Sequence, residues 1–386
     1  MRAETVELEH DVDLDDVCRG DGLLFVRNGV GVAGRDVVAR FDSAPSLAAV
    51  DGTSIAFATL PFEPTAAPTL LLARLTVTRG ADGRCTLTVI DGDVDAALEE
   101  LAAPVGPPRP AAFGFTVRPK SSVPHYLAAV RAARDAVRAG DIDKAVIARA
   151  VEVVGDEPID VHAVLLRLRA SFGSSYRYCV DGLIGASPEL LVEVAGTEVR
   201  SHPLAGTAPR SGDPETDRRS AEQLVASTKN QVEHRVVIDT IYDTLLPYCS
   251  YLDWEAEPSV LSVANVQHLA TRMEGRLSEP RPPAIELARE LAPTPALGGA
   301  PRDAALALIE RVEGFPRGRY GGAVGWLDAA GNGTFAVTIR CAELSADRRT
   351  ARLVAGGGIV ADSDPSSELA ETQAKLQAML SAIVRP

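Results

Sequence analysis

The chain has 386 residues, 46% of them hydrophobic, which is enough for one large domain or two ordinary ones with a substantial core. Its net charge of −14 argues against a nucleic-acid or anionic-membrane surface, so an anionic ligand would need local cations. The acidic amino terminus lacks the apolar core of a signal peptide, no uninterrupted apolar run reaches about 18 residues, and the five cysteines form no CxxC pair. We therefore expect a soluble, cytoplasmic protein with reduced thiols.

Residues 1–115 alternate short apolar runs with glycine and aspartate turns, which predicts a β-rich region. A hairpin is expected within residues 69–92, and short helices near Ser46 and Asp95. The stretch APVGPPRPAAFG at 103–114 is a candidate linker or a strap across a single domain. We expect an N-terminal β-rich subdomain over 1–115, in the same globule as a second region over 116–386.

The second region opens with a predicted helix over 124–139, capped by Gly140, and a strand that begins at Lys144. A lysine at the mouth of a strand is commonly a solvated edge charge. A helix over 160–172 and a strand over 175–181 follow.

Strands over 190–194 and 198–201 form a predicted hairpin, and Glu189 precedes it, directly after the turn made by Ser187 and Pro188. Residues 203–207 then leave the hairpin as an apolar loop with one hydroxyl. On these residues alone, Glu189 could be a surface acid and the loop a simple connection.

Residues 213–248 are strongly helical and contain Glu233 and His234, without the HExxH pattern of zinc proteases. The run 262–277 reads as a strand, and its His268, as a lone histidine, would more often be a hydrogen-bonded core residue than a catalyst. Helices are expected over 283–291 and 302–313, separated by a rigid loop, PTPALGGAP, that could line a pocket.

A hairpin is predicted about residues 330–333. On its second strand Phe335, Val337 and Ile339 share one face, so Arg340 lies on the other. An arginine that faces inward on such a strand is expected to meet a fixed carboxylate.

The run RLVAGGGIVADSDPSSELAETQAK at 352–375 reads as a strand, a glycine loop and a helix over about 366–383. Glu368, Glu371 and Lys375 lie on one helix face, next to glycine N–H groups that could bind a carboxylate. Two acids beside a bound carboxylate require a cation between them, and an all-oxygen site suits Mg²⁺. A solvated helix face after a simple turn is the plainer alternative, and a phosphate loop is weakly supported because GxxxxGK[ST] is absent.

Nine motifs together resemble the chorismate-utilising enzymes, and isochorismate synthases among them. In chain order they are DKAVIAR, GASPELL, PLAGT, VEH, VQHL, PTPALGG, RGRYGGAVGW, IRCA and GGGIVADSDPSSELAETQAKL. They span residues 144–375, whereas the N-terminal third matches only in general layout. The resemblance implies an α+β fold, like that of anthranilate synthase component I, with large, mostly antiparallel sheets packed together and helices outside.

The same resemblance implies the roles of individual residues. Lys144 would be the general base that activates water for attack at C2 of chorismate, and Glu189 the acid that protonates the departing C4 hydroxyl. Glu233, Glu368 and Glu371 would bind Mg²⁺, which takes a substrate carboxylate. The remaining candidates would bind or position the substrate: Gly206, Thr207, His268, Ala296, Leu297, Tyr320, Arg340, Gly356, Gly357, Gly358 and Lys375.

Members of the family differ in the nucleophile and in the fate of the product. The pair Ala296-Leu297 resembles the isochorismate synthase version of PTPALGG, and the LLES motif of feedback-inhibited enzymes is absent. We expect water as the nucleophile, release of isochorismate, a monomer and no glutaminase subunit. A salicylate synthase, which goes on to eliminate pyruvate, and a non-catalytic Mg²⁺-dependent chorismate sensor are the alternatives.

Overall fold

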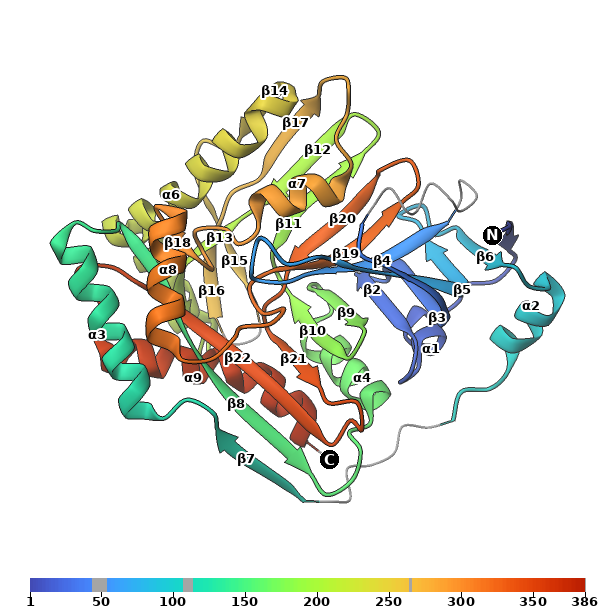
Figure 1. The fold of residues 1–386 in the computed structure, drawn as a ribbon, viewed down its shortest axis with the longest axis horizontal. Helices are drawn as coiled ribbons and strands as arrows, with labels where there is room; N and C mark the ends of the chain where they lie inside the picture. Colours follow the sequence, from blue (N-terminus) through green and yellow to red (C-terminus); the bar gives the residue numbers. More distant parts are fainter. Residues whose placement is uncertain (44–53, 107–113, 264–265, 386) are drawn as a thin grey trace.

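The computed structural model describes residues 1–43, 54–106, 114–263 and 266–385. These residues form a 19-stranded sheet, a separate three-stranded sheet and a set of surrounding helices (Figure 1). In both sheets, the paired strands of the described residues run antiparallel. The predicted α+β class, with large antiparallel sheets and helices outside, is confirmed.

The N-terminal third is β-rich, as its alternating pattern predicts. The predicted hairpin is β5–β6, and the helix near Asp95 is α2, whereas the helix expected near Ser46 and most of the predicted linker lie outside the described residues. The elements are β1 Ala3–Leu8, α1 Leu14–Cys18, β2 Leu23–Arg27, β3 Val30–Phe41, β4 Ile55–Leu60, β5 Thr69–Arg79, β6 Cys85–Ile90 and α2 Val94–Ala102.

Strands from this third pair directly with strands from the rest of the chain. β2 pairs with β9 (Tyr176–Val180), and β4 pairs with β19 (Ala323–Asp328). Phe57 and Phe335 belong to the same hydrophobic cluster. The division of the chain at residue 115 stays a prediction.

The centre of the second region is a long two-stranded ladder, β8 (Lys144–Gly155) with β22 (Thr350–Ile359), visible as the green and red strands that run side by side in Figure 1. Helix α9 (Pro365–Val384) packs against β22, and α3 (Val123–Ala139) and α8 (Arg302–Glu313) pack against β8. Asp364 caps α9 by accepting a hydrogen bond from the Ser367 backbone N–H.

The predicted glycine loop before α9 is wrong. Gly356, Gly357 and Gly358 continue β22 and pair with residues 146–148 of β8. The glycines do not form a turn. Their lack of a side chain lets other groups approach the strand closely, because a Cβ at Gly357 would lie 2.6 Å from Oε2 of Glu368. The glycines therefore let acidic side chains reach the strand.

The remaining elements follow the predicted order. The run 213–248 divides into two α-helices at Ser227, whose side chain caps the second by accepting from the Asn230 N–H. The elements are β7 Phe115–Pro119, α4 Val161–Phe172, β10 Leu183–Ser187, β11 Leu190–Ala195, β12 Glu198–His202, β13 Leu204–Pro209, α5 Pro214–Ala226, α6 Thr228–Leu245, the 3₁₀ turn Leu246–Tyr248, β14 Cys249–Trp254, β15 Ser259–Ser262, β16 Val266–Ala270, β17 Met273–Leu277, α7 Ala284–Leu291, β18 Gly299–Ala300, β20 Gly333–Val337 and β21 Cys341–Leu344.

Three local predictions are corrected. Residues 203–207 do not form a loop, since most of them belong to β13, where a register shift at Gly206 (φ +72°) disrupts the alternation that would mark a strand. The run 262–277 contains two strands, β16 and β17, that belong to different sheets. The strand predicted to carry Arg340 ends at Val337, and Arg340 itself has φ +51°.

No helix in the described residues is long and apolar enough to cross a membrane.

Candidate active site

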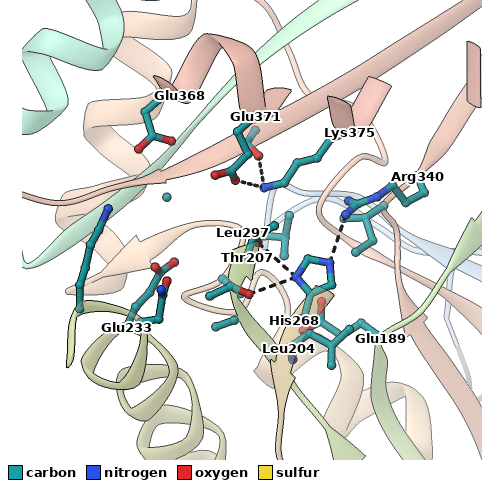
Figure 2. Close-up of a pocket in the computed structure, with 18 of the residues that line it drawn as sticks. Glu189, Leu204, Thr207, Glu233, His268, Leu297, Arg340, Glu368, Glu371 and Lys375 are labelled. Atoms are coloured by element: carbon teal, nitrogen blue, oxygen red, sulfur yellow. Dashed lines mark hydrogen bonds and ion pairs between the residues drawn. The ribbon is translucent and has the colours of Figure 1, made fainter. Parts of the chain in front are cut away.

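A cavity of about 220 Å³ lies among α6, α9, β13, β16 and the glycine end of β22. Figure 2 shows acidic and basic side chains from these elements turned toward one another. The residues that line it are Glu189, Leu204, Ala205, Gly206, Thr207, Lys229, Asn230, Glu233, His268, Ala296, Leu297, Tyr320, Ile339, Arg340, Gly356, Gly358, Glu368, Glu371 and Lys375.

Helix α9 brings two acids and a lysine to this cavity. Lys375 Nζ lies 2.5 Å from Glu371 Oε1 and donates to Gly356 O at 2.9 Å. Glu368 is buried, and its Oε2 has no hydrogen-bond partner. Burial and the nearby Glu371 raise the pKa of Glu368 to about 7. The alternative of a solvated helix face is therefore wrong at Glu368.

A third acid, Glu233 of α6, faces α9 across the cavity in Figure 2. Lys144 Nζ donates to Glu233 Oε1 at 2.7 Å, and Lys144 is only 3% exposed, so it is not a solvated edge charge. Burial alone would raise the pKa of Glu233, but the Lys144 ammonium holds it below its ordinary value. Gly358 makes room for this pair, since a Cβ there would lie 2.8 Å from Glu233 Oε1.

Glu189 lies in another part of the cavity, near His268 and Leu204 in Figure 2. It sits between β10 and β11, where the Ser187-Pro188 turn was predicted, and it is 2% exposed. Burial raises the pKa of Glu189 to about 7, although the Leu204 N–H donates to Oε1 at 3.3 Å and Arg340 lies near. A carboxyl with this pKa can donate a proton near neutral pH.

A chain of hydrogen bonds runs from Thr207 through His268 to Arg340. Arg340 Nη2 lies 3.3 Å from Nε2 of His268, and Thr207 Oγ1 lies 3.1 Å from Nδ1. Burial and Arg340 lower the pKa of His268 to about 3, so the imidazole is neutral. Its Nε2 therefore accepts from the guanidinium, and the proton on Nδ1 is available to Gly206 O at 3.2 Å.

The predicted fixed carboxylate for Arg340 is wrong for the described residues, where it makes no ion pair. The guanidinium lines the cavity and is bonded to a neutral histidine. It therefore keeps donors for an external anion.

Apolar and small residues form the rest of the wall. Ala296 and Leu297 come from the loop after α7, and Gly206 and Gly356 from β13 and β22. Tyr320 is 4% exposed, and burial raises the pKa of its phenol to about 12, which keeps the hydroxyl protonated.

Two sequence-predicted residues do not line the cavity. They are Lys144, which contacts Glu233, and Gly357, which faces Glu368. Sequence reasoning gave no role to five lining residues, Leu204, Ala205, Lys229, Asn230 and Ile339. Lys229 could have been found from its spacing, because it lies four residues before Glu233 on the same helix face.

The carboxylates of Glu233, Glu368 and Glu371 are the candidate ligands of a magnesium ion. As placed, no three acidic, histidine or cysteine side chains among the described residues lie close enough to enclose an ion. Glu233 and Glu371 are instead held by lysines, and Glu368 keeps one buried oxygen without a partner. Three carboxylates facing one cavity are an oxygen-only donor set, so their chemistry, although not their present spacing, fits a hard dication such as Mg²⁺.

The fold and this cavity define a chorismate-utilising protein: the sequence matches the family of chorismate binding enzymes over residues 69–384, and the chain belongs to that family. It is similar to a Mycobacterium tuberculosis protein named MenF, with 46% identity over 271 residues, which are 67% of this chain and 73% of the relative. The isochorismate synthase DhbC of Bacillus subtilis is 40% identical over 280 residues, 70% of each chain.

A solved structure also covers nearly the whole chain. The menaquinone-specific isochorismate synthase MenF of Escherichia coli superimposes with a TM-score of 0.86 at 26% identity, covering 99% of this chain and 94% of that one. The N-terminal third, which the motifs do not reach, is therefore included in the structural similarity.

Proposed function

We propose that this protein is an isochorismate synthase, which moves the hydroxyl of chorismate from C4 to C2 by adding one water and releasing another. Relatives named isochorismate synthase support this assignment. The observation that carries it is the position of Glu189, a buried carboxyl with its pKa raised to about 7, in a cavity that also contains an arginine without an acidic partner among the described residues.

Proton transfer requires a base and an acid. Glu189 lines the cavity, and Lys144 lies behind its wall, bonded to the lining residue Glu233. Lys144 acts in its neutral form, after its ammonium has lost a proton to solvent, and takes a proton from the attacking water. Glu189 gives a proton to the C4 hydroxyl, which leaves as water. The atoms balance, since one water enters and one departs. The exchange leaves Lys144 protonated and Glu189 ionised, and a proton transfer through solvent restores both.

Substrate binding uses the groups that do not transfer protons. Arg340 and Tyr320 offer donors to the substrate carboxylates, and the neutral His268 holds Arg340 in place. Lys375 lies beside the acids of α9, and Thr207 bonds His268 from the opposite side. The small residues Gly206 and Gly356 keep the walls close to the ring.

We further propose that Glu233, Glu368 and Glu371 hold Mg²⁺ when it is bound. The ion would supply positive charge between these acids and a substrate carboxylate, which would otherwise repel each other. The partnerless Oε2 of Glu368 supports this role.

Because the nucleophile is water, the reaction requires no ammonia-supplying subunit. The five cysteines are free, which agrees with a reducing compartment, and we propose a cytoplasmic location. The proposed function is tested by incubating the protein with chorismate and Mg²⁺ and identifying the product by mass and chromatography. Chorismate that binds but remains unchanged would instead indicate a sensor.

A further inference from the structure

A buried ion pair outside the cavity contacts the backbone of strand β8 and of the cavity wall at Leu297. Glu313 is the last residue of α8, and Arg317 follows four residues later. Both side chains are almost fully buried, at 1% and 2% exposure, and Arg317 Nε donates to Glu313 Oε2 at 2.9 Å. Neither residue lines the cavity.

The pair first fixes the strand that carries Lys144. Arg317 Nη2 donates to Val146 O at 2.7 Å, and the Ala148 N–H donates to Glu313 Oε1 at 2.6 Å. The neighbouring strand on this edge of β8, β18, is only two residues long and pairs with Ala145 and Lys144. Beyond the end of β18, the side chains of Arg317 and Glu313 bond the backbone of Val146 and Ala148, where a longer neighbouring strand would otherwise pair.

The pair also holds the cavity wall. Arg317 Nη1 donates to Leu297 O at 2.7 Å, in the loop that carries Ala296 and Leu297 into the cavity. The Arg317 guanidinium lies 4.2 Å from the ring centroid of Phe62 and 5.9 Å from that of Tyr320. One planar cation thus contacts the Lys144 strand, the Leu297 loop and Tyr320.

We propose that Glu313 and Arg317 are a positioning pair for the reaction, which sets the distance between the Lys144 end of β8 and the Leu297–Tyr320 wall without touching the substrate. This inference rests on the proposed function. Arginine suits the role because its fork offers five donors in one plane, and Glu313 orients that plane through two oxygens. A lysine at 317 could pair with Glu313 but could not reach both carbonyls in the same geometry.

The test compares this pair with a matched buried pair that does not line the cavity and makes no hydrogen bond to a lining residue. Asp15 of α1 and Arg177 of β9 are both 3% exposed and form a two-point contact at 2.5 and 3.0 Å. The variants are Arg317→Lys, Arg317→Met, Arg177→Lys and Arg177→Met. Each is measured for chorismate turnover at a temperature below its unfolding transition, and for thermal unfolding.

We expect the Arg317 variants to lose kcat by about 10- to 100-fold, more in Met than in Lys, with a smaller change in the KM for chorismate, because misplacement of catalytic groups by about 1 Å has effects of this size. The Arg177 variants should lose comparable stability and keep kcat within about twofold, since Arg177 bonds Asp15 and no lining residue, and loss of such a contact acts on the folded population rather than on the geometry of the reaction. If Arg317→Met fails to fold, Arg317→Lys provides the measurement.

A double variant, Glu313→Gln with Arg317→Met, separates the two roles further. It leaves no unpaired buried charge, so it should regain part of the stability while kcat stays low. Recovery of kcat together with stability, or equal losses of kcat in the Arg317 and Arg177 variants, would overturn the positioning role. A wild-type protein that does not turn over chorismate would overturn the proposed function instead.

Discussion

Replacing Glu189 by glutamine should make the protein more stable at alkaline pH and nearly inactive. Glu189 is 2% exposed, and burial raises its pKa from 4.5 to about 7. The folded state therefore binds more protons than the unfolded state between these values, and the stability that this group contributes falls as pH rises through that window. Glutamine cannot ionise, and it keeps an oxygen that can accept from the Leu204 N–H.

The size of the effect follows from the shift. With about 1.4 kcal/mol per pKa unit, the wild-type penalty is roughly 1.5 kcal/mol at pH 5.5 and about 3 kcal/mol at pH 8. A chain of 386 residues has an unfolding entropy of about 0.8 kcal/mol/K, so the gain at pH 8 corresponds to about 4 °C in Tm. Turnover should fall by about 10²- to 10⁴-fold, because an amide cannot protonate the leaving hydroxyl.

Urea unfolding of both proteins at pH 5.5 and pH 8, together with a turnover assay, measures these effects. Glu310→Gln, at an exposed position of α8, is the control and should change neither quantity. An equal stability difference at both pH values would show that Glu189 is not held neutral by burial. Near-normal turnover of Glu189→Gln would mean that the proton comes from another group.

Four further results are expected. Excess EDTA should stop turnover and Mg²⁺ restore it, and Glu371→Gln should raise the Mg²⁺ concentration for half-maximal rate by about 10-fold or more; an unchanged requirement would remove Glu371 from the site. Lys144→Ala should lower kcat by about 10²- to 10⁴-fold while calorimetry still detects chorismate binding, and lost binding would make Lys144 a carboxylate anchor. The product should keep the mass of chorismate, whereas pyruvate in a lactate-dehydrogenase-coupled assay, with salicylate fluorescence, would indicate a salicylate synthase. Lys229→Met should raise KM several-fold and leave kcat unchanged.

Capping residues, turns and alternating patterns in the sequence correctly predicted individual helices and hairpins. Helix α9 begins where Asp364 and Pro365 place it, and the β5–β6 hairpin follows from its alternation and turn. The α+β class came from the ordered motifs, because pairing between strands far apart, such as β4 with β19, leaves no local signal.

Two of the errors share one physical cause, which is that glycine suggests a turn or loop in the sequence. Gly356 to Gly358 lie within a strand because acidic side chains must approach the backbone there, and Gly206 marks a register shift within β13. The end of β20 at Val337 and the positive φ of the non-glycine residue Arg340 also have no sequence signature.

The sequence predicted which residue types form the site, but not which of these side chains bond to one another. The spacing of Glu368 and Glu371 on one helix face is visible in the sequence, whereas the bond between Lys144 and Glu233 joins elements 89 residues apart. Likewise, nothing local indicates that His268 would be the partner of Arg340. Tertiary contacts of this kind decide which charges are already neutralised.

Cations without an acidic partner explain how an acidic protein could bind a dicarboxylate. Lys229 is one of them, so we expect it to contribute to substrate binding. Lys144 and Lys375 are already bonded to Glu233 and Glu371, whereas Lys229 and Arg340 form no ion pair in the described part of the chain. Lys229 is exposed at the start of α6, so solvent screens its charge to about 1 kcal/mol at most, or roughly fivefold in KM. Lys229→Arg should restore KM, and Lys120→Met, at an exposed lysine that does not line the cavity, should leave it unchanged. A fall in kcat at constant KM in Lys229→Met would place this lysine in proton transfer instead of substrate attraction.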